Sequence, residues 1–174
     1  KSLDLEIIAP SHGIIWRTHK NDILNAYYEW SQNDPKDGAI VVFDSMWHST
    51  ETMAQTIAEA FKEKGMSVKL FDLKVNHNSD IIPYVLTSKY IAVGSPTLNN
   101  GMLPTVASFL CYLKGLSPKN RETFAFGSYG WGGQSIIQIE EQLKACGFHI
   151  CLDKMSISYI PKKEQLEEIT KSIL

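Results

Sequence analysis

The chain has 174 residues, of which 44% are hydrophobic and 21% charged, and its formal net charge is −2 at pH 7. This length and apolar content suit one globular domain with a hydrophobic core and a short extension. The lysines are scattered among glutamates, so no basic surface for a nucleic acid backbone is expected and nucleic acid is excluded as a partner. No stretch approaches the roughly 20 apolar residues of a membrane-spanning helix, so a membrane partner is excluded too.

Cysteine usage and the amino end predict the compartment. The three cysteines, Cys111, Cys146 and Cys151, form no CxxC pair, which argues against a disulfide scaffold and a zinc knuckle and favours reduced thiols. The first residues include Asp4 and Glu6 and do not resemble the basic and apolar segments of a signal peptide. The sequence therefore predicts a soluble cytoplasmic protein.

Residues 1–37 lack the regular pattern of the rest of the chain. The stretch APSHGIIWR (9–17) places His12 in a Pro-Ser-His-Gly turn. Apolar and aromatic residues at helical spacing predict an amphipathic helix over 18–33, and the polar run 31–38 is typical of a linker. We expect 1–37 to be the end of a preceding domain followed by a linker helix.

From residue 38 onward, strand and helix patterns alternate. Runs rich in β-branched and aromatic residues predict strands at 38–45, 67–73, 89–96, 122–130 and 148–158. Helical periodicity predicts helices at 49–65, 79–88, 104–116, 133–147 and 162–174, the second broken early by Pro83. This alternation predicts that 38–174 form an α/β domain, a doubly wound five-stranded parallel sheet with helices on both faces.

Ligands of such sheets bind at the carboxyl ends of the strands, where the strand order reverses. The loop after the first predicted strand consists of Ser45, Met46, Trp47, His48, Ser49 and Thr50. It matches neither the nucleotide P-loop nor the dinucleotide glycine pattern. Its hydroxyls and the free N–H groups of a helix start suit a terminal phosphate monoester without any lysine. Alternatively, Ser49 and Thr50 only cap the helix.

The loops after the third and fourth strands suit a flat ring. The first of them consists of Ser95, Pro96, Thr97, Leu98, Asn99, Asn100 and Gly101. Its last three residues tolerate left-handed backbone angles and can present N–H or C=O groups to a ring edge, although an ordinary turn is the alternative. The second consists of Ser128, Tyr129, Gly130, Trp131, Gly132 and Gly133, in which aromatic residues on a glycine-rich loop suit the walls of a flat ligand.

A phosphate cradle, an amide-rich edge and an aromatic wall on these three loops together indicate flavin mononucleotide (FMN). At this point the sequence resembles the flavodoxin-like fold, which implies a flavin that carries one or two electrons. A receiver domain of the same fold would need an acceptor aspartate where this chain has VGSP (93–96), so we reject it. A structural module that binds nothing stays open as an alternative.

The amino-acid sequences of the three loops point to a narrower family than the fold alone does. Four stretches carry a closer resemblance: APSHGIIWR, FDSMWHSTETMA, GSPTLNNGMLPTV and SYGWGG. Together they resemble the carboxyl-terminal half of a flavodiiron protein (A-type flavoprotein). The resemblance implies that 1–37 are the remnant of a metallo-β-lactamase-like domain and that 38–174 are the FMN-binding domain. It also implies that His12 is the last ligand of a diiron site. The other iron ligands of the family have no counterpart here, so we expect metal at His12 only together with the missing diiron domain, in the full-length parent.

The same resemblance implies a function. Electrons pass from a rubredoxin or flavin reductase to FMN and then to the diiron site, where oxygen or nitric oxide is reduced, in a parent that forms a homodimer or homotetramer. We expect Ser45, Ser49 and Thr50 at the phosphate, 97–101 along the ring edge and 129–133 at the ring wall, with Trp47 and Trp131 as stacking groups. No catalytic residue is expected in this chain. The alternative is a free-standing flavodoxin-like electron carrier or FMN-dependent reductase.

Overall fold

The computed structural model describes residues 5–173 and divides the chain into two compact units, 1–34 and 35–174. In the first unit, Ile8 and Trp16 exchange two backbone hydrogen bonds of 3.0 and 2.9 Å, which close a loop with His12 near its middle. Gly13, next to this histidine, has a φ of 101°, which only glycine adopts at little cost. The helix α1 (Lys20–Gln32) follows, within the predicted range 18–33.

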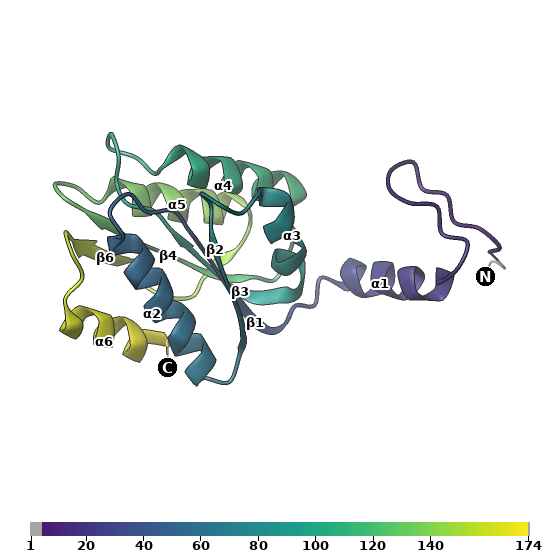
Figure 1. The fold of residues 1–174 in the computed structure, drawn as a ribbon, viewed down its shortest axis with the longest axis horizontal. Coiled ribbons are helices and arrows are strands. Elements are labelled where there is room, and N and C mark those ends of the chain that lie inside the picture. The colour runs from purple at the N-terminus through teal and green to yellow at the C-terminus, as the bar shows by residue number, and fades with distance from the viewer. Residues whose placement is uncertain (1–4, 174) are drawn as a thin grey trace. The chain divides into compact units, whose positions relative to one another are not determined.

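The second unit is built on a parallel sheet. Its strands β1 (Lys36–Phe43), β2 (Ser67–Asp72), β3 (Ser88–Gly94), β4 (Glu122–Tyr129) and β5 (His149–Ile150) lie in the order β2-β1-β3-β4-β5 (Figure 1). All pairings in it are parallel. The strand order reverses between β1 and β3, so the loops that follow these two strands flank the crevice where ligands of this fold bind. The predicted doubly wound sheet is confirmed.

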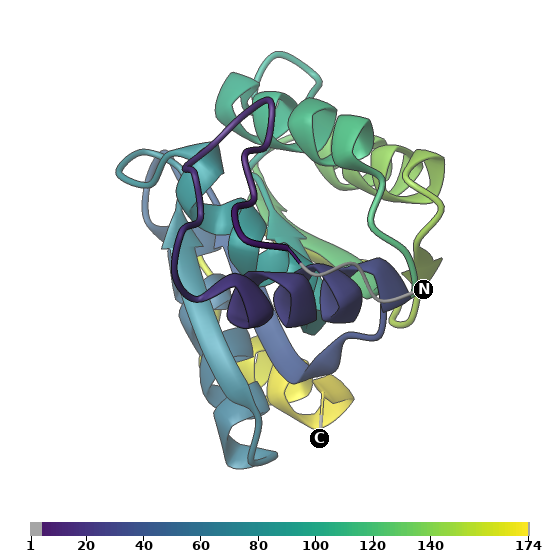
Figure 2. The ribbon, with the colours of Figure 1, turned by 90° about the vertical axis from the view of Figure 1, so that its right-hand side faces the viewer.

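Helices cover both faces of this sheet. The helices α2 (Ser49–Glu63) and α6 (Lys163–Ile173) contact each other on one face, while α3 (Asn78–Thr87), α4 (Pro104–Leu116) and α5 (Gln134–Ala145) cover the other (Figures 1 and 2). Alternate residues of β1 point to the two layers, since Ile40 and Val42 pack under α3 to α5 and Val41 and Phe43 pack under α2 and α6. Among the described residues, no helix has the length and apolar composition to cross a bilayer.

The predicted fifth strand, 148–158, is in fact two short strands. The strand β5 pairs with the start of β4, and β6 (Met155–Ser158) pairs with its end. Between the two ladders, residues 124–125 of β4 face residues 151–154, so two extra residues loop out of the pairing. The charged pair Asp153 and Lys154 lies in this interruption, which the continuous strand prediction missed.

The predicted early break at Pro83 is also wrong, because α3 runs through it to Thr87. A proline inside a helix removes one backbone hydrogen bond and usually ends or kinks the helix. Here Ile81 and Val85, one on each side of the proline, are fully buried in the core. Their burial stabilises the helix by more than the single missing bond weakens it.

Gly127 of β4 provides a test of strand packing. A Cβ atom at this position would lie 2.0 Å from the carbonyl oxygen of Ser95. We expect Gly127→Ala to lower the free energy of unfolding by about 3 kcal/mol or more, because backbone and not a flexible side chain must move. The control is Gly115→Ala in α4, where no atom lies within 4 Å and where alanine should add about 0.5–1 kcal/mol. Urea unfolding measures both, and equal midpoints for the two variants would contradict this packing.

The three cysteines differ in accessibility. Cys111 is exposed and Cys146 is buried, and no cysteine forms a disulfide in the described part of the chain. Burial raises the pKa of Cys146, and burial, with the charge of Glu122 as a second cause, raises the pKa of Cys151 to about 11. Since the pKa of Cys151 lies above that of an unfolded thiol, its neutral form stabilises the fold at neutral pH, and this contribution is lost as the pH rises toward about 11.

Thiol labelling tests this difference. At about pH 8 we expect iodoacetamide to modify the exposed Cys111 of the folded chain at least about tenfold faster than Cys146 and Cys151, because only thiolates react and the raised pKa keeps the latter two thiols neutral. Mass spectrometry of peptides measures the rates, and a denatured sample in which all three react serves as the control. Rapid labelling of Cys151 in the folded chain would contradict its raised pKa.

Candidate functional site

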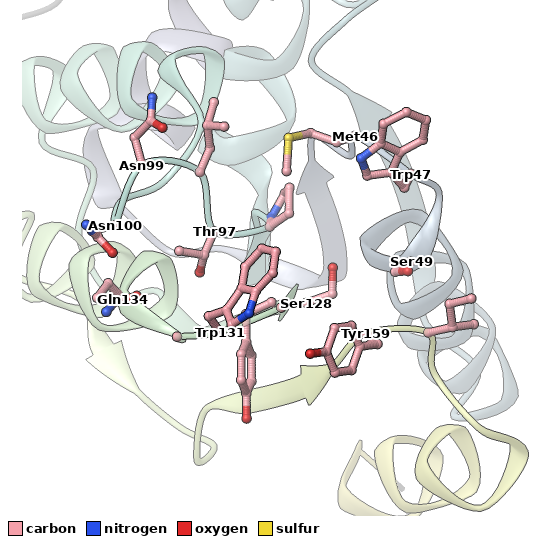
Figure 3. Close-up of a pocket in the computed structure, with 16 residues that line it drawn as sticks. Met46, Trp47, Ser49, Thr97, Asn99, Asn100, Ser128, Trp131, Gln134 and Tyr159 are labelled. Atoms are coloured by element: carbon pink, nitrogen blue, oxygen red, sulfur yellow. The ribbon is translucent and has the colours of Figure 1, made fainter.

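A pocket of about 750 Å³ opens at the carboxyl ends of the strands. Its volume lies in the range of small-molecule sites, about 300–1,000 Å³. The loops after β1, β3 and β4 and the segment after β6 form its walls (Figure 3). Its lining consists of Met46, Trp47, Ser49, Pro96, Thr97, Leu98, Asn99, Asn100, Ser128, Tyr129, Gly130, Trp131, Gly132, Gln134, Tyr159 and Ile160.

Most residues expected at a cofactor from the sequence line this pocket. The expected residues that do not line it are Ser45, His48, Thr50, Ser95, Gly101 and Gly133. The lining residues that the sequence analysis missed are Gln134, Tyr159 and Ile160. Tyr159 and Ile160 directly follow β6, so the rule that ligands bind beyond the carboxyl ends of strands could have found them. The N–H of Tyr159 donates to the carbonyl of Tyr129 at 2.7 Å, which attaches this segment to the end of β4.

The loop between β1 and α2 presents free hydrogen-bonding groups. His48 precedes α2 with a left-handed backbone, φ 65°, and its side chain does not cap the helix. The first N–H groups of a helix without a cap are available to an anion. Ser49 lies at this helix start and lines the pocket. The Ser45 hydroxyl, which lies behind the pocket lining, is the one buried side-chain polar atom among residues 5–173 without a hydrogen-bond partner.

A charged cluster lies directly behind this loop. The carboxylate of Asp44 is buried and accepts hydrogen bonds from the N–H of Ser45 at 2.6 Å and from the Thr105 hydroxyl at 2.5 Å. The ammonium of Lys74 lies 3.5 Å from Asp44 and donates to the carbonyl of Ser45. The loop itself has no lysine, as the sequence shows, but the fold brings one to its back from the connection after β2. The Lys74 charge offsets that of Asp44.

Hydroxyl groups join the three loops to one another. The hydroxyls of Thr50 and Ser128, both buried, are hydrogen-bonded at 3.0 Å and connect the start of α2 to the end of β4. The N–H of Thr97 donates to the carbonyl of Ser128 at 3.0 Å, and the Thr97 hydroxyl pairs with that of Ser135 at 2.9 Å. Thr50, expected at the phosphate, therefore holds loops together in this structure.

Ser95 has a similar internal role. Its hydroxyl accepts the N–H of Leu103 at 2.9 Å and donates to the carbonyl of Pro96 at 2.8 Å. Its carbonyl accepts the Ser135 hydroxyl at 3.2 Å. These bonds fix the path of the chain from β3 into the pocket wall, and Ser95 itself is fully buried behind that wall.

Residues 98–101 form a tight turn at the pocket. The N–H and C=O groups of Leu98 and Gly101 bond to each other, both at 2.9 Å, and Asn99 and Asn100 between them have φ angles of 49° and 59°. Positive φ at both central residues defines a type I′ turn. Of the three residues expected to tolerate a left-handed backbone, Asn99 and Asn100 adopt it and line the pocket, whereas Gly101 does neither.

Aromatic residues surround the opening of the pocket. Trp131 is 98% exposed and Trp47 is 84% exposed, and Tyr159 is exposed too. Figure 3 shows Met46, Trp47 and Ser49 on one side of the pocket and Asn99, Asn100 and Gln134 on the other, with Trp131 between them. A planar ligand between these groups would cover indole surface that now contacts water, which favours binding.

The histidines lie apart from the pocket lining. His48 pairs with Glu51 at 2.7 Å, and His149 pairs with Glu122 at 2.5 Å. His12 is exposed in the loop closed by Ile8 and Trp16. Within residues 5–173, no group of three or more His, Cys, Asp or Glu side chains is arranged to hold a metal ion.

Comparison with known proteins identifies the family and the fold. Residues 41–172 match the flavodoxin family. The chain is 41% identical to a nitric oxide reductase of Moorella thermoacetica, over 95% of this chain and 42% of that protein. The solved structure of a rubredoxin oxygen:oxidoreductase from Desulfovibrio gigas has a TM-score of 0.90 and 38% identity, over 97% of this chain and 42% of that one. A flavodiiron protein from Giardia intestinalis has a TM-score of 0.88 and 26% identity over the same shares of the two chains.

The chain thus spans less than half the length of the curated relatives it matches. What it shares with them includes the flavodoxin-like part, and FMN is the cofactor of flavodoxins. The chain belongs to the flavodoxin family, and it is an FMN-binding domain of the kind found in flavodiiron proteins.

Proposed function

We propose that this chain is the electron-transfer part of a flavodiiron-type oxidoreductase that reduces oxygen or nitric oxide. It receives electrons from a rubredoxin or a flavin reductase and passes them to a diiron site held by residues outside this chain. The observation that carries the proposal is the pocket at the strand ends, where hydroxyls, a type I′ turn and two exposed indoles meet. Relatives named nitric oxide reductase and rubredoxin oxygen:oxidoreductase support it.

Each part of FMN has matching groups. The phosphate would be held by Ser45, Ser49 and the free N–H groups at the start of α2, the ring edge by residues 97–101, and the ring faces by Trp47 and Trp131. When bound, FMN supplies one- and two-electron redox chemistry. The protein orients the ring between the indoles and excludes water from its faces. Its buried, unpartnered Ser45 hydroxyl is the strongest sign of a fit, because native structures rarely leave such a group unpaired.

The neutral lining limits which groups can bind the phosphate. All sixteen lining residues have uncharged side chains. Backbone N–H groups and hydroxyls must therefore hold the phosphate, with no direct ion pair from the lining. Behind the loop, the charges of Asp44 and Lys74 offset each other in part.

The first unit fits the same proposal. Residues 1–37 would be the end of a metallo-β-lactamase-like domain and the linker to the flavin domain, residues 38–174. His12 would complete a diiron site whose other ligands come from that domain. In its favour, His12 is exposed near the middle of a closed loop, next to a left-handed glycine. We further propose a cytoplasmic location, which suits the free thiols, and a parent that is a homodimer or homotetramer.

Replacement of Ser45 tests the phosphate assignment. We expect Ser45→Ala to weaken FMN about tenfold and riboflavin, which has no phosphate, less than about twofold, because one hydrogen bond to an anion is lost. The flavin-free chain should keep or slightly gain stability, because a buried group without a partner is removed. Fluorescence titration with both flavins and urea unfolding measure these effects.

Ser95→Ala is the matched control. Ser95 is 0% exposed and Ser45 is 2% exposed, but the Ser95 hydroxyl has two partners. We expect Ser95→Ala to destabilise the chain by about 1–3 kcal/mol, since it leaves the N–H of Leu103 unpaired. Equal weakening of FMN and riboflavin by Ser45→Ala would refute the phosphate assignment.

Reduction of the FMN-loaded chain separates the proposal from its alternative. Under argon, reduced rubredoxin should bleach the flavin spectrum of the chain within seconds, whereas NADH or NADPH alone should not. The reason is that a carrier accepts electrons from a protein donor, while a free-standing FMN-dependent reductase oxidises its nucleotide directly. Stopped-flow absorbance measures both, with free FMN as the control. Direct and repeated oxidation of NADH or NADPH by the chain would favour the free-standing reductase.

A further inference from the structure

The turn at 98–101 needs support from outside itself. Asn99 and Asn100 both hold a left-handed backbone, which asparagine adopts more readily than most residues but less readily than glycine. Type I′ turns usually connect two paired strands, which keep them in place. Here the pairing is a single isolated bridge between Leu98 and Gly101, which belongs to no strand. The turn that lines the pocket therefore lacks the usual ladder.

Gln138 of α5 supplies that support. Its side-chain amide nitrogen donates to the carbonyl of Asn100 at 3.3 Å, and its amide oxygen accepts the N–H of Met102 at 3.1 Å. A Cβ atom at Gly101 would lie only 3.0 Å from that oxygen, so the side chain packs closely against the turn. Gln138 does not itself line the pocket.

The chemistry of this contact requires a carboxamide. The carbonyl of Asn100 needs a donor and the N–H of Met102 needs an acceptor, and one side chain meets both. Glutamate can only accept when ionised, and lysine can only donate. Asparagine is one methylene shorter and cannot span the same distance.

The same helix also holds the other end of the loop. The Ser135 hydroxyl, one turn before Gln138, pairs with that of Thr97 at 2.9 Å. Gln134, at the start of α5, lines the pocket next to Asn100 in Figure 3. The first two turns of α5 thus set where residues 97–101 face the pocket.

We propose that Gln138 is a positioning residue for the flavin, which acts through the 98–101 turn. It fixes the direction of the peptide groups of Asn99 and Asn100 at the ring edge, and so sets both the affinity for the ring and the reduction potential of the bound flavin. The proposal rests on the proposed FMN site. The two hydrogen bonds of Gln138 to the turn, however, are present in the flavin-free chain and can be tested there.

The test compares Gln138→Met, Gln138→Glu and the control Gln142→Met, the same change one turn further along α5. In the flavin-free chain, we expect the amide hydrogen of Met102 to exchange about tenfold faster in Gln138→Met, because its acceptor is gone, and little faster in Gln138→Glu, which keeps the acceptor. With flavin, Gln138→Met should weaken FMN and riboflavin equally, by about five- to tenfold, and shift the midpoint potential. Gln138→Glu should be intermediate in affinity, and Gln142→Met unchanged in every measurement.

The outcomes separate the two proposals. If the wild-type chain binds no flavin, both the FMN proposal and the role of Gln138 toward the flavin are overturned. If flavin binds and Gln138→Met leaves affinities and potential as in Gln142→Met, only the positioning role is overturned. Weaker binding of FMN with unchanged riboflavin would also overturn it, because that pattern belongs to the phosphate end. Should Gln138→Met fail to fold, Gln138→Glu decides by the same criteria.

Discussion

The site depends on the hydrogen bonds that join three loops from separate strands. The buried hydroxyl pair of Thr50 and Ser128, 3.0 Å apart, holds the start of α2 to the end of β4. Thr97 then binds both the Ser128 carbonyl and the Ser135 hydroxyl. A parallel sheet brings the ends of its strands to one edge, but it does not fix the loops beyond them. These neutral bonds do so without placing a charge in the pocket.

The absence of charge from the pocket lining has a consequence for the phosphate. A lysine in the lining would attract any anion, whereas N–H groups and hydroxyls at fixed positions select for the geometry of a phosphate. Behind the loop, Lys74 lies 3.5 Å from Asp44, so the two charges offset each other in part. Under the phosphate assignment proposed above, the phosphate would complete the hydrogen bonding of the Ser45 hydroxyl, which has no partner within residues 5–173.

The sequence predicted the sheet and three of the four walls of the pocket, because those features depend on local patterns. Buried strands, helix starts and a turn-forming asparagine pair are each visible within ten residues of sequence. The interruption at 151–154 and the course of α3 through Pro83 were not predictable, because tertiary packing overrides local preference there. Lys74 and Gln138 were missed for a related reason, since each reaches its loop from more than 25 residues away.

The most direct test of the account is the affinity of the wild-type chain for FMN and riboflavin at low and high salt. We predict that FMN binds at one per chain and much more tightly than riboflavin, and that its affinity changes less than about threefold between about 0.05 and 0.5 M salt, because neutral groups hold the phosphate. Equal affinities for the two flavins, or a steep loss of FMN binding with salt, would contradict the neutral phosphate site on which the account rests.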